Sequence, residues 1–155
     1  LEACVGRPIE RLVYASSSSV YGDGVSLPMR EDVPLQPVSP YGVTKLSAEQ
    51  LCHLYHVNYK VPAVSLRYFT VYGPRQRPDM GFHRFFTAVM AGAPVPQFGD
   101  GRQTRDFTFV ADAVSAGDGR LFPRNASRGP GVQLPGACWP AALPRSAGLR
   151  RRARV

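Results

Sequence analysis

The sequence predicts an α/β fold with a parallel sheet, and three observations support that prediction. Two short apolar runs, residues 11–16 and 63–68, have the composition of buried parallel strands. A stretch of helical pattern separates them, beginning near Ser39 and continuing to about Val57. A strand, a helix and a second strand in this order form a βαβ unit, whose strands are parallel and whose crossover is almost always right-handed.

The first predicted strand, residues 11–16, runs directly into four serines, Ser16 to Ser19. Ligands of open α/β sheets bind beyond the carboxyl ends of the strands, so these hydroxyl groups are expected where chemistry can take place. For the serines alone, a low-complexity turn is the simpler interpretation. Residues 21–38, rich in glycine and proline, are typical of a surface loop.

The helix is expected to begin with Ser39 as its N-cap and Pro40 at the first helical position. Tyr41 and Lys45 are four residues apart and therefore share one face of the helix. An ammonium group near a phenol stabilises the phenolate, so Tyr41 is a candidate base and Lys45 its cationic partner. Ser17 adds a hydroxyl group to the same candidate catalytic set.

Two further groups of side chains lie on this predicted helix. An apolar stripe is expected to pack against the rest of the domain, and it consists of Val43, Leu46, Leu51, Leu54 and Tyr55. Three potential metal ligands are close in sequence, namely Cys52, His53 and His56. Since no further ligand accompanies them, we expect packing roles and no metal site.

Beyond the second strand, the pattern predicts shorter elements. Residues 69–81 indicate a loop, and residues 82–91 have the apolar spacing of a helix that ends at a glycine. Strands are expected over residues 95–98 and 104–110, and a further helix begins at Ala111.

The composition changes abruptly at residue 117. Residues 1–116 contain 11 lysines and arginines against 10 acidic residues, whereas residues 117–155 contain 8 arginines and one acidic residue, so nearly all of the net charge of +8 lies in the last 39 residues. Glycine, proline, alanine and arginine supply 25 of those 39 residues. Such a segment buries little apolar surface, so residues 117–155 are expected to be disordered, or to result from translation of GC-rich DNA out of frame.

Several classes of protein are disfavoured by the composition. No apolar run approaches the roughly 20 residues that a membrane-spanning helix needs, and the first residues lack the layout of a signal peptide. Three scattered cysteines do not make a disulfide framework, which favours a cytoplasmic protein. The arginines of the tail leave a nucleic-acid-binding protein open as a minor alternative.

Four linked motifs resemble one known family. They are YASSSSVYG at residues 14–22, SPYGVTK at residues 39–45, LRYF with VYGPRQ at residues 66–76, and GDGRQTRDF at residues 99–107. In this order they are similar to the NAD-dependent nucleotide-sugar epimerases and dehydratases of the extended short-chain dehydrogenase/reductase group, UDP-glucose 4-epimerase among them. The resemblance implies the carboxy-terminal part of a Rossmann-like sheet plus part of a small substrate lobe, with residues 1–116 as a partial domain.

The resemblance also implies roles for individual residues. Tyr41 would be the catalytic base, Lys45 would bind the nicotinamide ribose, and Ser17 would hydrogen-bond the reacting sugar hydroxyl. Tyr68 would lie along the cofactor, NAD. Substrate contacts are implied for Ser17, Ser18, Thr70, Arg75, Gln76 and Arg105, the last reaching the pyrophosphate, a role that suits the planar guanidinium. Thr70 departs from the asparagine common in the family.

The reaction implied by the resemblance is epimerisation at C4 of a nucleotide sugar, with a UDP-sugar favoured, through a 4-keto intermediate. Related 4,6-dehydratases have an acid pair where this sequence has Ser18 and Ser19, and serine hydroxyls do not ionise at neutral pH, so epimerisation is favoured over dehydration. The glycine-rich NAD-binding turn of the family is missing. The chain is therefore expected to be a fragment, either active within a larger enzyme or catalytically inactive, and the family suggests a homodimer.

Overall fold

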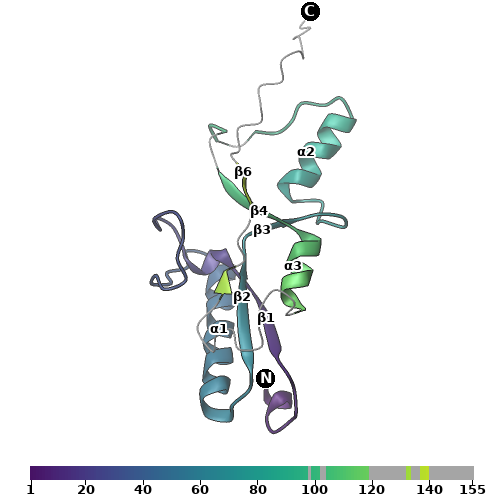
Figure 1. Ribbon diagram of the computed structural model, residues 1–155. Helices are drawn as coiled ribbons and strands as arrows, with labels where there is room; N and C mark the ends of the chain where they lie inside the picture. Colours follow the sequence, from purple (N-terminus) through teal and green to yellow (C-terminus); the bar gives the residue numbers. More distant parts are fainter. Residues whose placement is uncertain (98, 102–103, 119–131, 134–136, 140–155) are drawn as a thin grey trace, which may run out of the picture.

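The computed structural model describes residues 1–97, 99–101, 104–118, 132–133 and 137–139. They form two three-stranded sheets that follow one another along the molecule, with helices beside them (Figure 1). This is the α/β fold with parallel strands that the sequence predicts.

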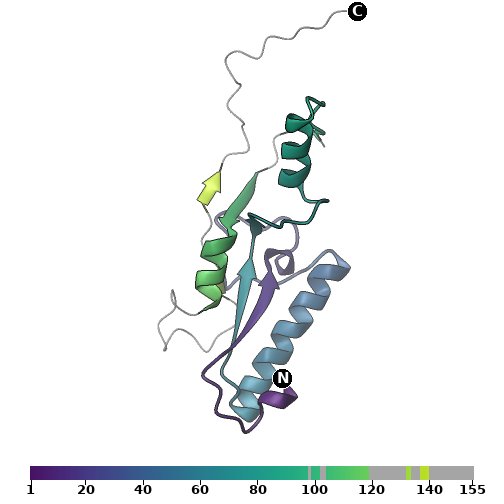
Figure 2. The same cartoon turned by 90° about the vertical axis from the view of Figure 1, so that its right-hand side faces the viewer.

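The first sheet has the strand order β1-β2-β5, comprising β1 (Leu12–Ser17), β2 (Ala63–Tyr68) and β5 (Val132–Gln133), and all its pairs are parallel. Leu12 is the register partner of Ala63, and Ser17 is that of Tyr68. The helix α1 (Pro40–Tyr59) connects β1 to β2, which confirms the predicted βαβ unit. In two perpendicular views, α1 lies on one side of β1 and β2 and the helix α3 (Val110–Gly117) on the other (Figure 1, Figure 2).

The start of α1 is fixed by the expected cap. The Ser39 side chain accepts a hydrogen bond from the Gly42 amide at 3.0 Å, and Pro40 occupies the first helical position. At the other end, Lys60 adopts a left-handed conformation with φ of 60° and its amide donates to the carbonyl of His56. The helix therefore ends two residues beyond the predicted boundary.

Three of the five residues of the predicted apolar stripe of α1 do not face the core, whereas Leu46 and Tyr55 are half-buried. Val43, Leu51 and Leu54 are 46–50% exposed, whereas the buried residues of the helix are Gly42, Glu49 and Cys52. The face of α1 that packs on β1 and β2 is thus the face that continues from Tyr41 and Lys45. Hydrophobicity alone indicated the wrong face, because this helix buries small and paired polar groups.

The second sheet has the order β3-β4-β6, comprising β3 (Thr70–Tyr72), β4 (Arg105–Phe109) and β6 (Ala137–Trp139). β3 and β4 are parallel, while β6 runs antiparallel to β4. The helix α2 (Gly81–Met90) packs on this sheet through aromatic rings, with the Phe82 and Phe107 ring centroids 4.6 Å apart. α2, β4 and α3 confirm the predicted elements to within about a turn.

Two local expectations were wrong. The segment 69–81, expected to be only a loop, contains the short strand β3. Residues 95–97 of the expected strand are not in a strand, because Pro94 and Pro96 remove the amide donors that a ladder needs. Within residues 117–155, Gly117 ends α3, and β5 and β6 pair with β2 and β4. The remainder of that segment, for which disorder is expected, lies outside the described residues.

Two single-turn 3-10 helices complete the description. η1 (Glu2–Cys4) precedes β1, and η2 (Ser18–Val20) follows it directly. No helix in the described part of the chain is long and apolar enough to cross a membrane.

Candidate active site

The serine run forms a tight turn at the carboxyl end of β1, in which Ser16 and Ser17 are buried. Ser17 is 9% exposed and serves as the N-cap of η2. Its hydroxyl oxygen accepts a hydrogen bond from the Ser19 amide at 3.2 Å, and the Ser17 and Ser19 hydroxyls are 3.2 Å apart. The serines are thus an ordered turn at the sheet edge where α/β proteins bind ligands.

Tyr41 and Lys45 lie together on α1, as their spacing predicted. The Lys45 Nζ atom is 5.6 Å from the centroid of the Tyr41 ring and 5.4 Å from that of Tyr14. It donates a hydrogen bond of 2.8 Å to the carbonyl oxygen of Ala15 in β1. The Tyr41 side chain is 55% exposed, so its phenol remains accessible to a ligand while Lys45 connects the helix to the end of the strand.

Gly42 allows the first turn of α1 to approach the serine turn. A Cβ atom at this position would lie 2.5 Å from the carbonyl oxygen of Ser19 and 2.9 Å from the Cβ of Pro37. Both distances are below normal contact, so only glycine fits without a shift. The close contact places the residue next to Tyr41 directly against the turn that carries Ser17.

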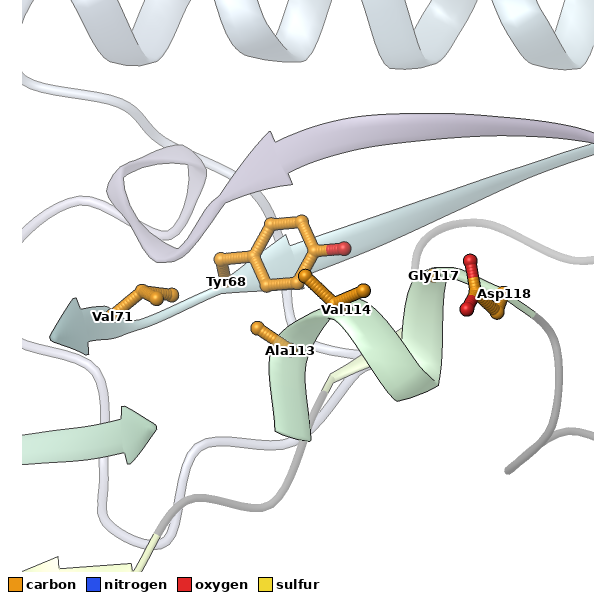
Figure 3. A pocket seen from close by; sticks show the side chains of 6 residues that line it. All are labelled: Tyr68, Val71, Ala113, Val114, Gly117 and Asp118. Atoms are coloured by element: carbon orange, nitrogen blue, oxygen red, sulfur yellow. The ribbon is translucent and has the colours of Figure 1, made fainter. Parts of the chain in front are cut away.

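Tyr68 ends β2 beside Ser17, its register partner. Its ring lines a hollow of about 370 Å³ and points along α3 (Figure 3). The other lining residues come from β3 and α3 and its end, namely Val71, Ala113, Val114, Gly117 and Asp118. Burial raises the pKa of the Tyr68 phenol, so this side chain stays neutral and acts as an aromatic wall of the hollow.

A buried polar network lies beneath these residues, and sequence reasoning missed it. Arg67 is fully buried, and its Nε and Nη2 atoms donate to the Glu49 carboxylate at 3.0 and 2.8 Å. Its Nη1 donates to the Tyr21 hydroxyl at 2.9 Å, and the Ser16 hydroxyl donates to Glu49 Oε1 at 2.5 Å. Burial lowers the pKa of Arg67, but the hydrogen bonds with Glu49 and Tyr21 outweigh it and raise the pKa overall.

Two signals in the sequence pointed to this network. A charged residue inside a predicted buried strand, Arg67, needs a charged partner, since lone charges are almost never buried. Glu49 is four residues beyond Lys45 and eight beyond Tyr41, and therefore lies on the same helix face.

The remaining predicted site residues belong to the second sheet and the loop after it. Thr70 begins β3, and the exposed Arg105 begins β4, where its Nη1 donates to the Thr104 carbonyl at 2.8 Å. The exposed Arg75 has φ of 67°, and the Gln76 side chain donates to the Val71 carbonyl at 3.3 Å. Among the described contacts, none joins these side chains to Ser17, Tyr41 or Lys45, so they flank the serine turn without forming part of it.

The donor set suits a nicotinamide cofactor better than a metal. Lys45 presents an ammonium group at the strand end, next to the exposed Tyr41 ring, and Tyr68 supplies an aromatic surface; these are groups that can hold a ribose and a nicotinamide. Within the described residues, no three His, Cys, Asp or Glu side chains gather in a way that could bind a metal ion.

Comparison with known proteins shows the family of the chain. Residues 1–118 match the model of the NAD dependent epimerase/dehydratase family. The chain is 53% identical over 114 residues to an uncharacterized UDP-glucose epimerase, YtcB, of Bacillus subtilis, and 47% identical over 116 residues to a UDP-glucuronate 4-epimerase of Thermodesulfobacterium geofontis. Each alignment covers 74% of this chain and 36% of the relative.

Solved structures show the same likeness. The crystal structure of UDP-glucuronic acid 4-epimerase from Bacillus cereus, in complex with UDP-glucuronic acid and NAD, is 47% identical with a TM-score of 0.78, over 87% of this chain and 42% of that one. The chain thus spans about two fifths of the length of these proteins. The family model covers most of the chain, so the chain belongs to the family of NAD-dependent epimerases and dehydratases.

Proposed function

We propose that the protein containing this chain is an NAD-dependent nucleotide-sugar 4-epimerase that acts on a UDP-sugar. The observation that carries the proposal is the placement of Tyr41 and Lys45 against the serine turn at the carboxyl end of β1. Relatives described as UDP-glucuronate 4-epimerases, 44% and 47% identical to this chain, make UDP-glucuronate the first substrate to test.

Each residue of the site has a defined task in this proposal. Tyr41 takes the proton from the 4-hydroxyl group of the sugar and later returns it. Lys45 stabilises the phenolate and binds the ribose, and Ser17 holds the sugar hydroxyl by a hydrogen bond. Lys45 and Tyr68 would hold NAD, which would supply the hydride acceptor and donor for C4. Rotation of the 4-keto sugar between the two transfers exposes its other face, and the 4-epimer results.

The other predicted contacts hold the substrate. Tyr68 forms the aromatic wall next to the cofactor. Arg105 binds the pyrophosphate through its planar guanidinium, which is exposed at the start of β4. The remaining substrate contacts are assigned to Ser18, Thr70, Arg75 and Gln76.

The serine turn favours epimerisation over dehydration. Elimination of water from the sugar needs an acid and a base next to the reacting carbons, and Ser18 and Ser19 supply neither at neutral pH. The Ser17 hydroxyl donates a hydrogen bond to the Ser19 hydroxyl, and a serine pair of this kind offers no ionisable acid or base for elimination.

The test is turnover of the complete gene product with NAD and UDP-glucuronate, followed by chromatography of the UDP-sugars. Tyr41→Phe should lower kcat by about 100- to 10,000-fold, the range expected for loss of a positioned base. Tyr59→Phe is the matched control, since Tyr59 is 51% exposed near the far end of the same helix. Full activity of Tyr41→Phe would refute the assignment of the base.

A catalytically inactive chain that only holds a nucleotide sugar is the second candidate. The chain spans 36% of the length of its relatives, so turnover has to be measured on this chain as well as on the complete gene product. Binding of UDP-glucuronate without turnover, measured by calorimetry, would support it.

A further inference from the structure

Arg67 connects three segments of the chain in the interior of the first sheet. Its side chain is 0% exposed. It donates to Glu49 in α1, to the Tyr21 hydroxyl at the end of η2, and to the carbonyl oxygen of Glu31 at 3.3 Å in the loop that follows. The guanidinium also lies 5.0 Å from the centroid of the Tyr21 ring. One buried side chain thus holds the helix, the serine turn and the loop against β2.

Glu49 extends the same network to β1. Its carboxylate receives hydrogen bonds from Arg67 and from the Ser16 hydroxyl. Glu49 also lies on the face of α1 that carries Tyr41 and Lys45, one turn beyond Lys45. A change in the position of Glu49 would therefore shift or rotate α1, and with it Tyr41 and Lys45, relative to β1.

The strand register links the network to the candidate site. Ser16 is the register partner of Arg67, and the next pair along the two strands is Ser17 with Tyr68. Each of these two site residues therefore directly follows a network residue. Because side chains alternate along a strand, the network occupies the α1 side of the sheet while Ser17 and Tyr68 start from the other side.

Stability alone is a poor explanation for this arrangement. Removing a carboxylate and a guanidinium from water is costly, and well-packed apolar side chains of similar volume often replace a buried ion pair without loss of stability. Four polar groups held in fixed directions specify geometry, which apolar side chains do not.

We infer that Glu49, Arg67 and Tyr21 are positioning residues that fix the serine turn and the Tyr41–Lys45 face relative to each other. None of the three is placed in contact with substrate or cofactor, and the inference rests on the proposed function for its catalytic consequence. Its structural part concerns the turn alone and is testable without cofactor or sugar.

The first experiment measures amide hydrogen exchange by NMR in the full chain. Tyr21→Phe removes the hydroxyl that receives the Arg67 hydrogen bond and keeps the ring. Exchange at the Ser18 to Tyr21 amides should become about tenfold faster, the size expected for one buried hydrogen bond, while amides in the middle of α1 stay unchanged. Unchanged exchange in the serine turn would overturn the inference.

Tyr55→Phe is the matched control for this experiment. The Tyr55 hydroxyl also makes one hydrogen bond, to Glu2 Oε2 at 2.6 Å, but far along α1 from the serine turn. It should leave exchange in the turn unchanged. If both variants accelerated amide exchange in the serine turn equally, the effect of Tyr21→Phe would be a general loss of stability, and the inference would be overturned.

The second experiment measures kcat and KM of the complete gene product. The double variant Glu49→Leu with Arg67→Met replaces the ion pair by apolar side chains and should fold, whereas kcat should fall by about 100-fold with little change in KM, the size expected for a misplaced catalytic group. Arg67→Lys keeps the positive charge but loses the forked guanidinium. Its kcat should lie between those of the unaltered protein and the double variant. A folded double variant with normal kcat would overturn the inference.

The two experiments separate the inference from the proposed function. If the unaltered protein shows no turnover with any UDP-sugar, the proposed function fails, and the exchange measurement still decides whether the network fixes the turn. If the unaltered protein turns over and Tyr21→Phe changes neither exchange nor kcat, only the positioning role fails.

Discussion

Lys45 shows how far single residues could be predicted from the sequence. The four-residue spacing predicted that its ammonium group lies near Tyr41, and the 5.6 Å distance to the ring confirms it. The hydrogen bond to the Ala15 carbonyl was not predictable, because it depends on where α1 lies relative to β1. The buried ion pair of Glu49 and Arg67 was missed although Arg67 lies in a predicted buried strand, because the pattern does not show which residue, here one 18 positions away, is its partner.

Cys52 provides a prediction at the scale of one residue. Burial raises the pKa of the Cys52 thiol, and a hydrogen bond with Ser65 offsets only part of this. At pH 8, Cys52 should therefore react with Ellman's reagent at least about tenfold more slowly than the partly exposed Cys4, because the thiolate is the reactive form. In a Cys138→Ala background, which removes the third thiol, the slow phase should vanish in Cys52→Ala and persist in Cys4→Ala.

The sign of the same shift predicts a pH effect on stability. The folded state favours the neutral Cys52 thiol. The contribution of this thiol to the free energy of unfolding is therefore complete below the pKa of the unfolded chain, and it is lost as the pH rises through the raised pKa of the folded state. When the pH is raised above about 9, the melting temperature of Cys52→Ala should thus fall less than the melting temperature of the parent protein. Parallel curves for the two proteins would contradict the assigned shift.

At the scale of elements, α1 and the two strands beside it were predicted to within about two residues. Their signals are local, namely a serine-proline cap, apolar runs and a loop rich in glycine and proline. The strands β3, β5 and β6 have two or three residues each and are defined by their pairing with neighbouring strands. No local sequence pattern therefore predicts them.

Gly42 gives the prediction for this scale. In an ordinary helix, Gly→Ala stabilises by about 1 kcal/mol. Here the added Cβ would meet the Ser19 carbonyl at 2.5 Å, so Gly42→Ala should lower the melting temperature and shift the NMR signals of the Ser18 and Ser19 amides. Gly81→Ala, whose Cβ would meet only the Phe85 ring at 3.9 Å, is the control and should be neutral or stabilising. Stabilisation by both substitutions would show that the close contact is absent in solution.

At the scale of the whole molecule, the outer face of α1 carries the next prediction. Val43, Leu51, Leu54 and Val57 are each 46–50% exposed on this helix. We propose that this face supports the homodimer suggested by the family, because exposed apolar stripes of this kind mark contact sites. Leu51→Lys combined with Leu54→Lys should shift the sedimentation coefficient towards the monomer.

The control for the dimer experiment is Val89→Lys on α2, where Val89 is 64% exposed and lies away from α1. It should leave the sedimentation profile unchanged. A parent protein that sediments as a monomer at all concentrations tested would rule out the dimer.

The parallel register of β1 and β2 has a consequence for how this gene can change. Ser16 pairs with Arg67 and Ser17 pairs with Tyr68 across the two strands, with the network on one side of the sheet and the side chains of Ser17 and Tyr68 on the other. Inserting or deleting one codon in either strand would exchange the two sides, since side chains alternate with a period of two. Single-residue insertions and deletions in residues 12–17 or 63–68 should therefore be tolerated far less than substitutions there, which a deep mutational scan would reveal.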